Sequence, residues 1–177
     1  MALVVGGASV AQAGPATSRS ASAFWVVGDA ADTRVSLQAT EPAGGAAGGT
    51  VFVFVTQRWC DTGADQMVFR SYSNAGAAVD ARAFGVRPNL RAAGLAATVS
   101  LTGSEQRLSP CAAPTGIPTT TPLGTTAAAI SAAWTGTGDT YVVQDGIVGR
   151  AATAAGSIAG IGELGTSQTA ELRSTSI

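Results

Sequence analysis

The stretch TVFVFVTQRWC, residues 50–60, is the strongest strand signal in the chain and decides the fold. Its β-branched and aromatic residues follow one another without Gly or Pro, which is typical of a β-strand. Valine and phenylalanine alternate from Val51 to Val55, so both faces of this strand are apolar. We therefore expect it to be the central strand of a sheet.

Similar segments recur on both sides of this stretch, separated by clusters of Gly, Pro, Asp and Thr. In Arg34–Thr40, apolar and polar residues alternate, which predicts one packed face and one solvated face. Helix signals are nearly absent. We therefore predict an all-β fold, an antiparallel β-sandwich of about 7–10 short strands that is immunoglobulin-like or jelly-roll-like. The expected strands are 23–27, 34–40, 50–60, 66–72, 78–84, 95–101, 127–134, 140–144, 149–155 and 167–172.

The length of 177 residues predicts a single domain, which we place at residues 14–177. Residues 109–126 form the longest irregular segment, with four prolines and a run of three threonines. We expect an exposed Pro/Thr-rich loop there. A linker between two small domains is the alternative, although neither half is large enough for a separate core.

The first residues are typical of an export signal. Residues 2–10 are a short apolar stretch, and Ala11-Gln12-Ala13 matches the small-x-small pattern of a signal-peptidase site. We interpret residues 1–13 as a signal-peptide remnant and expect a secreted or extracytoplasmic protein. The alternative is a plain first strand, because no positive charge precedes the apolar stretch. The chain contains no run of eighteen apolar residues, so we expect no membrane span in the mature chain.

Two cysteines, Cys60 and Cys111, are present. In an exported chain they predict one disulfide, and two buried free thiols are the alternative. No C-x-x-C spacing occurs, so neither redox catalysis nor structural zinc is supported.

The composition excludes several kinds of chemistry, because the chain has no His and all ten basic residues are Arg. A single chain therefore lacks the residues for Ser-His-Asp or Cys-His catalysis, for a Schiff-base lysine and for a His-ligated metal. The net charge of -1 provides no basic face for nucleic acid. We expect no cofactor and no metal.

One short segment resembles an active site. Asp61-Thr62-Gly63-Ala64-Asp65 follows the strongest strand, and it resembles the signature of retropepsin-type aspartic peptidases. Gly146–Arg150 is similar to the apolar-apolar-Gly-Arg element of that family. The resemblance implies a homodimer in which Asp61 supplies one catalytic carboxylate, Thr62 braces it and Gly63 allows the tight turn. A plain Asp/Gly turn between two strands is the competing interpretation.

The sequence also offers residues for a calcium site and for a glycan-binding surface. Asp61 with Asp65, or Asp29 with Asp32, could ligate calcium, although neither pair approaches the ligand density of a defined calcium loop. Four aromatic residues could form a platform for a glycan, although positions within strands favour a core role. These residues are Trp25, Trp59, Tyr72 and Trp134.

We therefore expect an exported, non-catalytic structural or binding domain of the cell envelope or extracellular space. The sequence does not identify the ligand or partner; a cell-wall glycan and another envelope protein are the two candidates. The alternative is a retropepsin-like endopeptidase that acts as a homodimer through Asp61.

Overall fold

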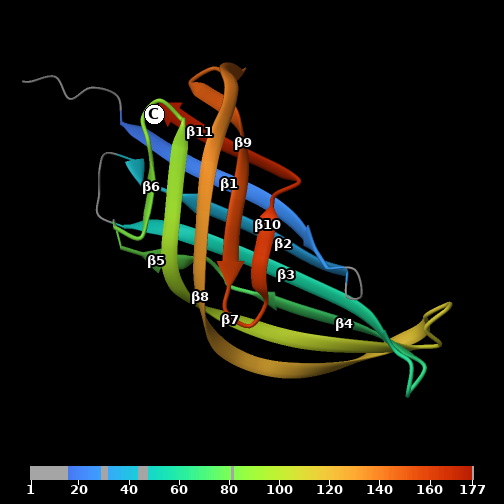
Figure 1. Ribbon diagram of the computed structural model, residues 1–177. Helices are drawn as coiled ribbons and strands as arrows, with labels where there is room; N and C mark the ends of the chain where they lie inside the picture. The colour runs from blue at the N-terminus through green and yellow to red at the C-terminus, as the bar shows by residue number, and fades with distance from the viewer. Residues whose placement is uncertain (1–15, 29–31, 44–47, 81, 177) are drawn as a thin grey trace, which may run out of the picture.

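The computed structural model describes residues 16–28, 32–43, 48–80 and 82–176. The expected signal segment lies outside these ranges. Eleven strands, all in antiparallel pairs, make up most of the described residues, which contain no α-helix (Figure 1). The predicted all-β, sandwich-like fold is therefore confirmed. The strands are β1 (Thr17–Val27), β2 (Asp32–Thr40), β3 (Gly49–Asp61), β4 (Gln66–Ser73), β5 (Ala77–Val79), β6 (Phe84–Val86), β7 (Ala92–Ser109), β8 (Thr115–Gln144), β9 (Ile147–Ile158), β10 (Gly162–Thr166) and β11 (Thr169–Ser176).

The strands form one continuous sheet whose hydrogen-bonded neighbours make a closed circuit. The order runs β9-β11-β1-β2-β3-β4-β7, and β8 completes the circuit because it pairs with both β7 and β9. Figure 1 shows β7, β8 and β9 crossing in front of β1 to β4. The two layers of the sandwich are thus parts of one sheet, rather than the two separate sheets of an immunoglobulin-like domain.

A single apolar core lies between the two layers. Trp25 and Leu37 contribute from β1 and β2, and Trp134 contributes from β8; each is at most 1% exposed. The Trp134 ring meets the Phe84 ring edge-on, with 6.4 Å between the ring centroids. The indole N–H of Trp134 donates to the backbone carbonyl of Ser22 at 2.9 Å, which ties the two layers together.

The segment that decides the fold behaves partly as predicted. β3 pairs with β2 on one side and with β4 and β5 on the other, so it is an interior strand of the sheet. Val51, Val53 and Val55 are buried, whereas Phe52 and Phe54 are 45% and 51% exposed. The central position is therefore confirmed, but only one of the two apolar faces is packed, because the inner side of the sheet faces the core and no described strand covers its outer side at Phe52 and Phe54.

The prediction of a loop at residues 109–126 is wrong for most of this segment. Only residues 110–114 lie between strands, and β8 begins at Thr115. Pro118 and Pro122 lie within β8, where the strand pairs with β7 on one side and with no described strand on the other. Proline is tolerated at such an edge because a missing N–H there interrupts no second ladder.

Strand lengths differ from the prediction as well. Residues 127–134 and 140–144, expected as two strands, belong to the single long strand β8. Residues 78–84, expected as one strand, are divided between β5 and β6. Long strands arise here because β7 and β8 run from one layer into the other instead of ending at the edge of a layer.

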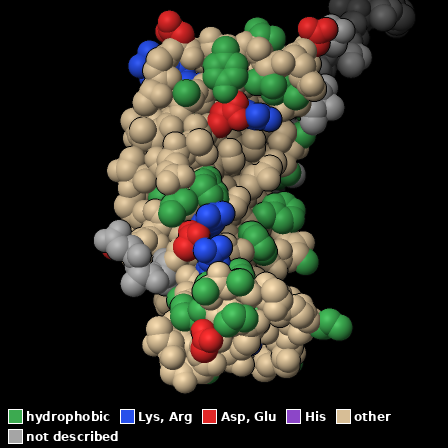
Figure 2. Space-filling model, turned by 90° about the vertical axis from the view of Figure 1, so that its right-hand side faces the viewer, with side chains coloured by type: hydrophobic (Ala, Val, Ile, Leu, Met, Phe, Trp, Pro, Cys, Tyr) green, Lys and Arg blue, Asp and Glu red, His purple; other side chains and the backbone are tan. Residues whose placement is uncertain are grey.

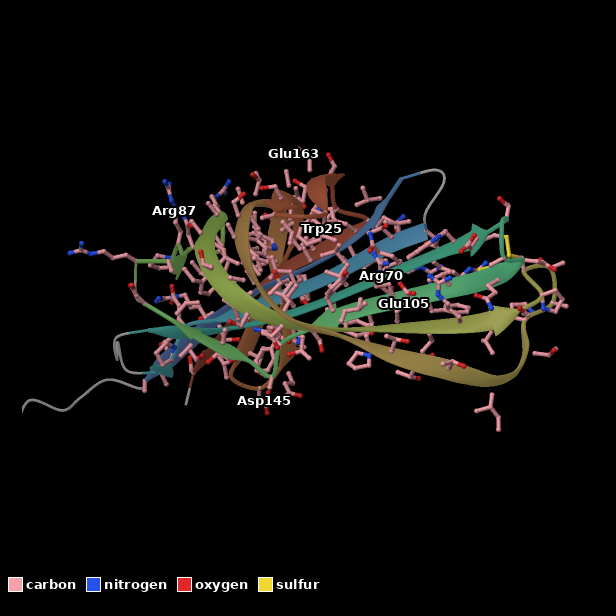
Figure 3. The ribbon with its side chains drawn as sticks, turned by 90° about the horizontal axis from the view of Figure 1, so that it is seen from below. Trp25, Arg70, Arg87, Glu105, Asp145 and Glu163 are labelled. Atoms are coloured by element: carbon pink, nitrogen blue, oxygen red, sulfur yellow. A yellow bond between two sulfur atoms is a disulfide. The ribbon has the colours of Figure 1, made fainter. Side chains whose placement is uncertain are left out.

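Two paired hairpins project beyond the two-layered part of the molecule, and we call this projection the arm. It consists of residues 57–61 and 66–70 of the β3–β4 hairpin with residues 104–109 and 115–122 of the β7–β8 hairpin. Figure 3 shows the arm at the right, with the disulfide near its tip. The arm has an inner face that continues the core-facing side of the sheet.

Candidate functional site

Asp61, the aspartate of the peptidase-like segment, is the last residue of β3 and lies at the tip of the arm. Its Oδ2 atom is 3.1 Å from Nη1 of Arg107, and its Oδ1 atom accepts a hydrogen bond from the backbone N–H of Ala64 at 3.3 Å. The side chain is 37% exposed. Thr62 and Gly63 are exposed in the turn that follows. Asp61 thus caps a turn and forms an ion pair.

The tip is held by the disulfide between Cys60 and Cys111, which was one of the two possibilities for these cysteines. Asp65 reinforces the same link. Its Oδ1 atom accepts from the backbone N–H of Cys111 at 3.1 Å, and its backbone carbonyl accepts from the Ser109 hydroxyl at 3.1 Å. The turn between β3 and β4 is therefore tied to the turn between β7 and β8.

A chain of ion pairs runs along the inner face of the arm, from Asp61 at the tip to Arg70 at the base. Arg107 donates to Asp61 and, through Nε, to Oε1 of Glu105 at 2.8 Å. Glu105 in turn accepts on Oε2 from Nη2 of Arg70 at 2.6 Å. The Arg70 guanidinium lies 4.9 Å from the centre of the Trp59 ring, a cation–π contact. Two cations and two anions neutralise one another in this network.

The register of the strands explains why these residues meet. Arg70 lies directly opposite Glu105 in the β4–β7 pair, and Arg107 follows Glu105 at the next position on the same face. Gln57 of β3 lies opposite Arg70 on the other side of β4. Figure 3 shows Arg70 and Glu105 close together at the base of the arm.

Glu105 is the most buried member of the network, with a side chain only 10% exposed. The hydrogen bond from Arg70, supported by the one from Arg107, holds the pKa of Glu105 below its usual range, although burial acts in the opposite direction. The same bond raises the pKa of Arg70. Glu105 is thus a fixed anion at neutral pH and holds both arginines in place.

A cavity of about 440 Å³ opens where the arm joins the two-layered part, and we call it the mouth cavity. Its floor consists of apolar side chains from both layers, including Val55, Leu101, Ala128 and Ile158. Its rim carries hydrogen-bonding side chains, namely Gln57, Arg70, Tyr72 and Thr126. This volume is typical of a site for a small molecule.

The aromatic residues considered as a glycan platform do not share one surface. Trp25 and Trp134 are buried in the core and donate their indole N–H groups to backbone carbonyls. Trp59 lies on the arm against Arg70, and Tyr72 lies at the rim of the mouth cavity. The structure therefore brings only Trp59 and Tyr72 into the region of the candidate site.

The described residues contain no group of three or more His, Cys, Asp or Glu side chains that could hold a metal ion. Of the two carboxylate pairs considered for calcium, Asp61 and Asp65 make the protein contacts given above. Asp29 lies outside the described residues, and Asp32 forms an ion pair with Arg34 at 2.9 Å. A larger depression of about 760 Å³ lies between β3 and β5, and its lining includes Thr50 and Asp80.

The charged surface is sparse. In Figure 2, acidic and basic side chains gather in a few small clusters, most of which contain both signs, and uncharged surface separates them. No helical segment in the described part of the chain is long and apolar enough to cross a membrane.

Arg70, Glu105 and Arg107 were not among the residues singled out from the sequence. The spacing Glu105-x-Arg107 does place two opposite charges on one face of a strand, and this was the available signal. The partnership with Arg70 depends on the register between β4 and β7, and no local sequence pattern indicates this pairing because β5 and β6 lie between the two strands in the chain.

Comparison with known proteins gives no match: no protein-family model, no curated protein and no solved structure corresponds to this chain.

Proposed function

We propose that this chain is an exported, non-catalytic binding domain of the cell envelope or extracellular space, and that its ligand enters the mouth cavity. The observation that carries the proposal is the cavity itself, which combines an apolar floor with hydrogen-bonding side chains at one rim. Its volume lies within the range of small-molecule sites.

The arrangement around Asp61 supports a structural role for this residue. An aspartic dyad requires a carboxylate that faces a second carboxylate and shares a proton with it. The Asp61 carboxylate instead contacts Arg107 and the Ala64 backbone, beside a disulfide. These contacts are those of a braced turn.

The disulfide also supports the export part of the proposal. Disulfides form and persist in oxidising compartments and are rare in reducing ones. The bond between Cys60 and Cys111 joins two hairpins that are otherwise held at their tips by Asp61, Asp65 and Ser109. A chain made for an oxidising environment would use such a bond to fix the arm.

The experiment is cleavage of an unfolded protein substrate between pH 3 and pH 7 by the folded chain, with a known acid peptidase as positive control. Asp61→Asn is the test variant, and Asp65→Asn is the matched control in the same turn. We expect no cleavage by any of the three chains. Cleavage that is lost in Asp61→Asn and retained in Asp65→Asn would establish the peptidase and overturn the proposal.

A further inference from the structure

The floor of the mouth cavity favours an apolar group. The buried side chains of Val55, Leu101, Ala128 and Ile158 close its bottom, and the half-buried side chains of Tyr72 and Ile161 present apolar surface to it. Among the residues that the structure describes, Arg70 is the only charged one that lines the cavity. An apolar ligand body of limited size would gain free energy by leaving water for this surface, whereas a charged group would lose its hydration there.

The rim of the cavity offers hydrogen bonds without net charge. Arg70 donates through Nε and Nη2 to Glu105, and a guanidinium has five N–H groups, so further donors remain for a ligand. The positive charge of Arg70 is already compensated by Glu105. Gln57 and Thr126 add neutral donors and acceptors at the same rim.

The charges at the rim determine whether an anionic or an uncharged ligand head group is preferred. A carboxylate placed beside Arg70 would also lie near the Glu105 carboxylate, whose repulsion would offset the attraction of the arginine. A neutral hydroxyl, ester or amide oxygen can accept from the remaining N–H groups without that repulsion. The rim therefore favours an uncharged head.

From these observations we infer that the mouth cavity binds an uncharged amphiphile, a small molecule with an apolar body and a neutral, oxygen-bearing head such as a medium-chain alcohol or ester. The inference rests on the proposed binding function and names the ligand class for the same cavity.

The test uses the full chain with Nile red, an uncharged dye whose fluorescence rises in apolar surroundings, and displaces the dye with octanol or octanoate at pH 7. Thr126→Trp places a large side chain at the rim of the cavity from an exposed position. Thr125→Trp is its control, because the neighbouring Thr125 points to the opposite side of the strand, where its hydroxyl forms a hydrogen bond with that of Thr102. We expect Thr126→Trp to weaken dye binding by about tenfold or more, and Thr125→Trp to change it by less than about twofold.

Competition tests the charge of the head. We expect octanol to displace the dye at concentrations about tenfold lower than octanoate, since the rim compensates no added anion. Glu105→Gln removes the opposing carboxylate, so octanoate should gain at least about fivefold in that variant. Equal binding by the two tryptophan variants would overturn the site. Octanoate that competes as well as octanol in the unaltered chain would overturn the ligand class.

The dye-binding experiments and the cleavage experiment test the ligand class and the proposed function separately. A chain that cleaves no protein and also binds no dye would lose this inference and keep the non-catalytic assignment. A chain whose cleavage depends on Asp61 would lose the proposed function whatever the dye shows.

Discussion

At the scale of single residues, Glu105 is the key to the arm. Its carboxylate accepts from Arg70 and from Arg107, and the latter also reaches Asp61. Removing this one charge would leave two arginines without their common partner, whereas removing Asp61 would break a partly exposed ion pair of low value and one hydrogen bond of 3.3 Å from the Ala64 backbone. Asp61, which belongs to the motif recognised in the sequence, thus contributes less to stability than Glu105, which belongs to no motif.

Glu105→Gln should lower the free energy of unfolding by about 1–3 kcal/mol at pH 7, since a nearly buried acceptor of charged hydrogen bonds is lost and solvent screens part of the effect. Urea denaturation measures this difference. Glu163→Gln is the control, because Glu163 is an exposed glutamate on β10. An equal loss in both variants would contradict the role given to Glu105.

The loss of stability in Glu105→Gln should depend on pH. The folded-state pKa of Glu105 lies below its ordinary value of 4.5, so its stabilising effect is complete above that value and is lost as the pH falls through the folded-state pKa. We therefore expect the stability difference between the unaltered chain and Glu105→Gln to be constant from pH 7 to about pH 5 and to shrink at lower pH. A difference that grows on acidification would have the wrong sign.

At the scale of elements, the long strands depend on a bend where β7 and β8 pass from one layer to the other. Gly103 of β7 pairs with Gly124 of β8, and the register shifts directly after this pair, leaving Leu123 as an extra residue. The Tyr72 ring covers Gly103, so that a Cβ atom added there would lie 2.7 Å from the ring. Glycine at position 103 therefore makes room for the tyrosine at the rim of the mouth cavity.

Gly103→Ala should lower the free energy of unfolding by about 1–3 kcal/mol, which is the usual cost of overpacking. Gly94→Ala is a matched control on the same strand, because a Cβ atom added at Gly94 meets no atom within 4 Å. This variant should stay within about 0.5 kcal/mol of the unaltered chain. Chemical denaturation of both variants decides the point, and similar stabilities would refute the close packing of Tyr72.

At the scale of elements, the disulfide is the second feature that stabilises the fold. Cys60 and Cys111 are separated by 51 positions, and in the chain-entropy model closing such a loop stabilises the fold by about 4 kcal/mol. Replacing both cysteines by serine should remove up to that amount and should increase amide hydrogen exchange first in the arm. Unchanged stability, with exchange in the arm as slow as before, would show that the hairpins hold one another without the bond.

At the scale of the whole molecule, the sequence predicts the class of fold better than its connections. Alternation in Arg34–Thr40 and the apolar run at 50–60 correctly indicate strands, because each is a local property. The closure of the sheet is not local, since it depends on β8 pairing with both β7 and β9. The apolar side chains of Phe52 and Phe54 mislead for this reason, because nothing local tells which side of the sheet will be covered.

The candidate site is likewise only partly predictable from the sequence, because some of its features are local and others depend on the closed sheet. The turn after β3 is visible in the sequence as Asp61-Thr62-Gly63, and so is the pairing of the two cysteines. The mouth cavity is not visible, because its floor combines residues from β3, β7, β8 and β9 that only the closed sheet brings together. Proline and threonine in residues 115–126 suggest a loop, yet they form a strand whose outer edge has no described partner.

The central claim is that the mouth cavity is the binding site, and amide NMR correlation spectra of the isotope-labelled chain, titrated with octanol, test it most directly. We predict saturable shifts that are largest at residues of the rim and floor, such as Tyr72, Leu101, Thr126 and Ile158, with the turn at Asp61 unaffected. Shifts centred on the Asp61–Asp65 turn, or no saturable shift at any residue of the cavity, would contradict the account.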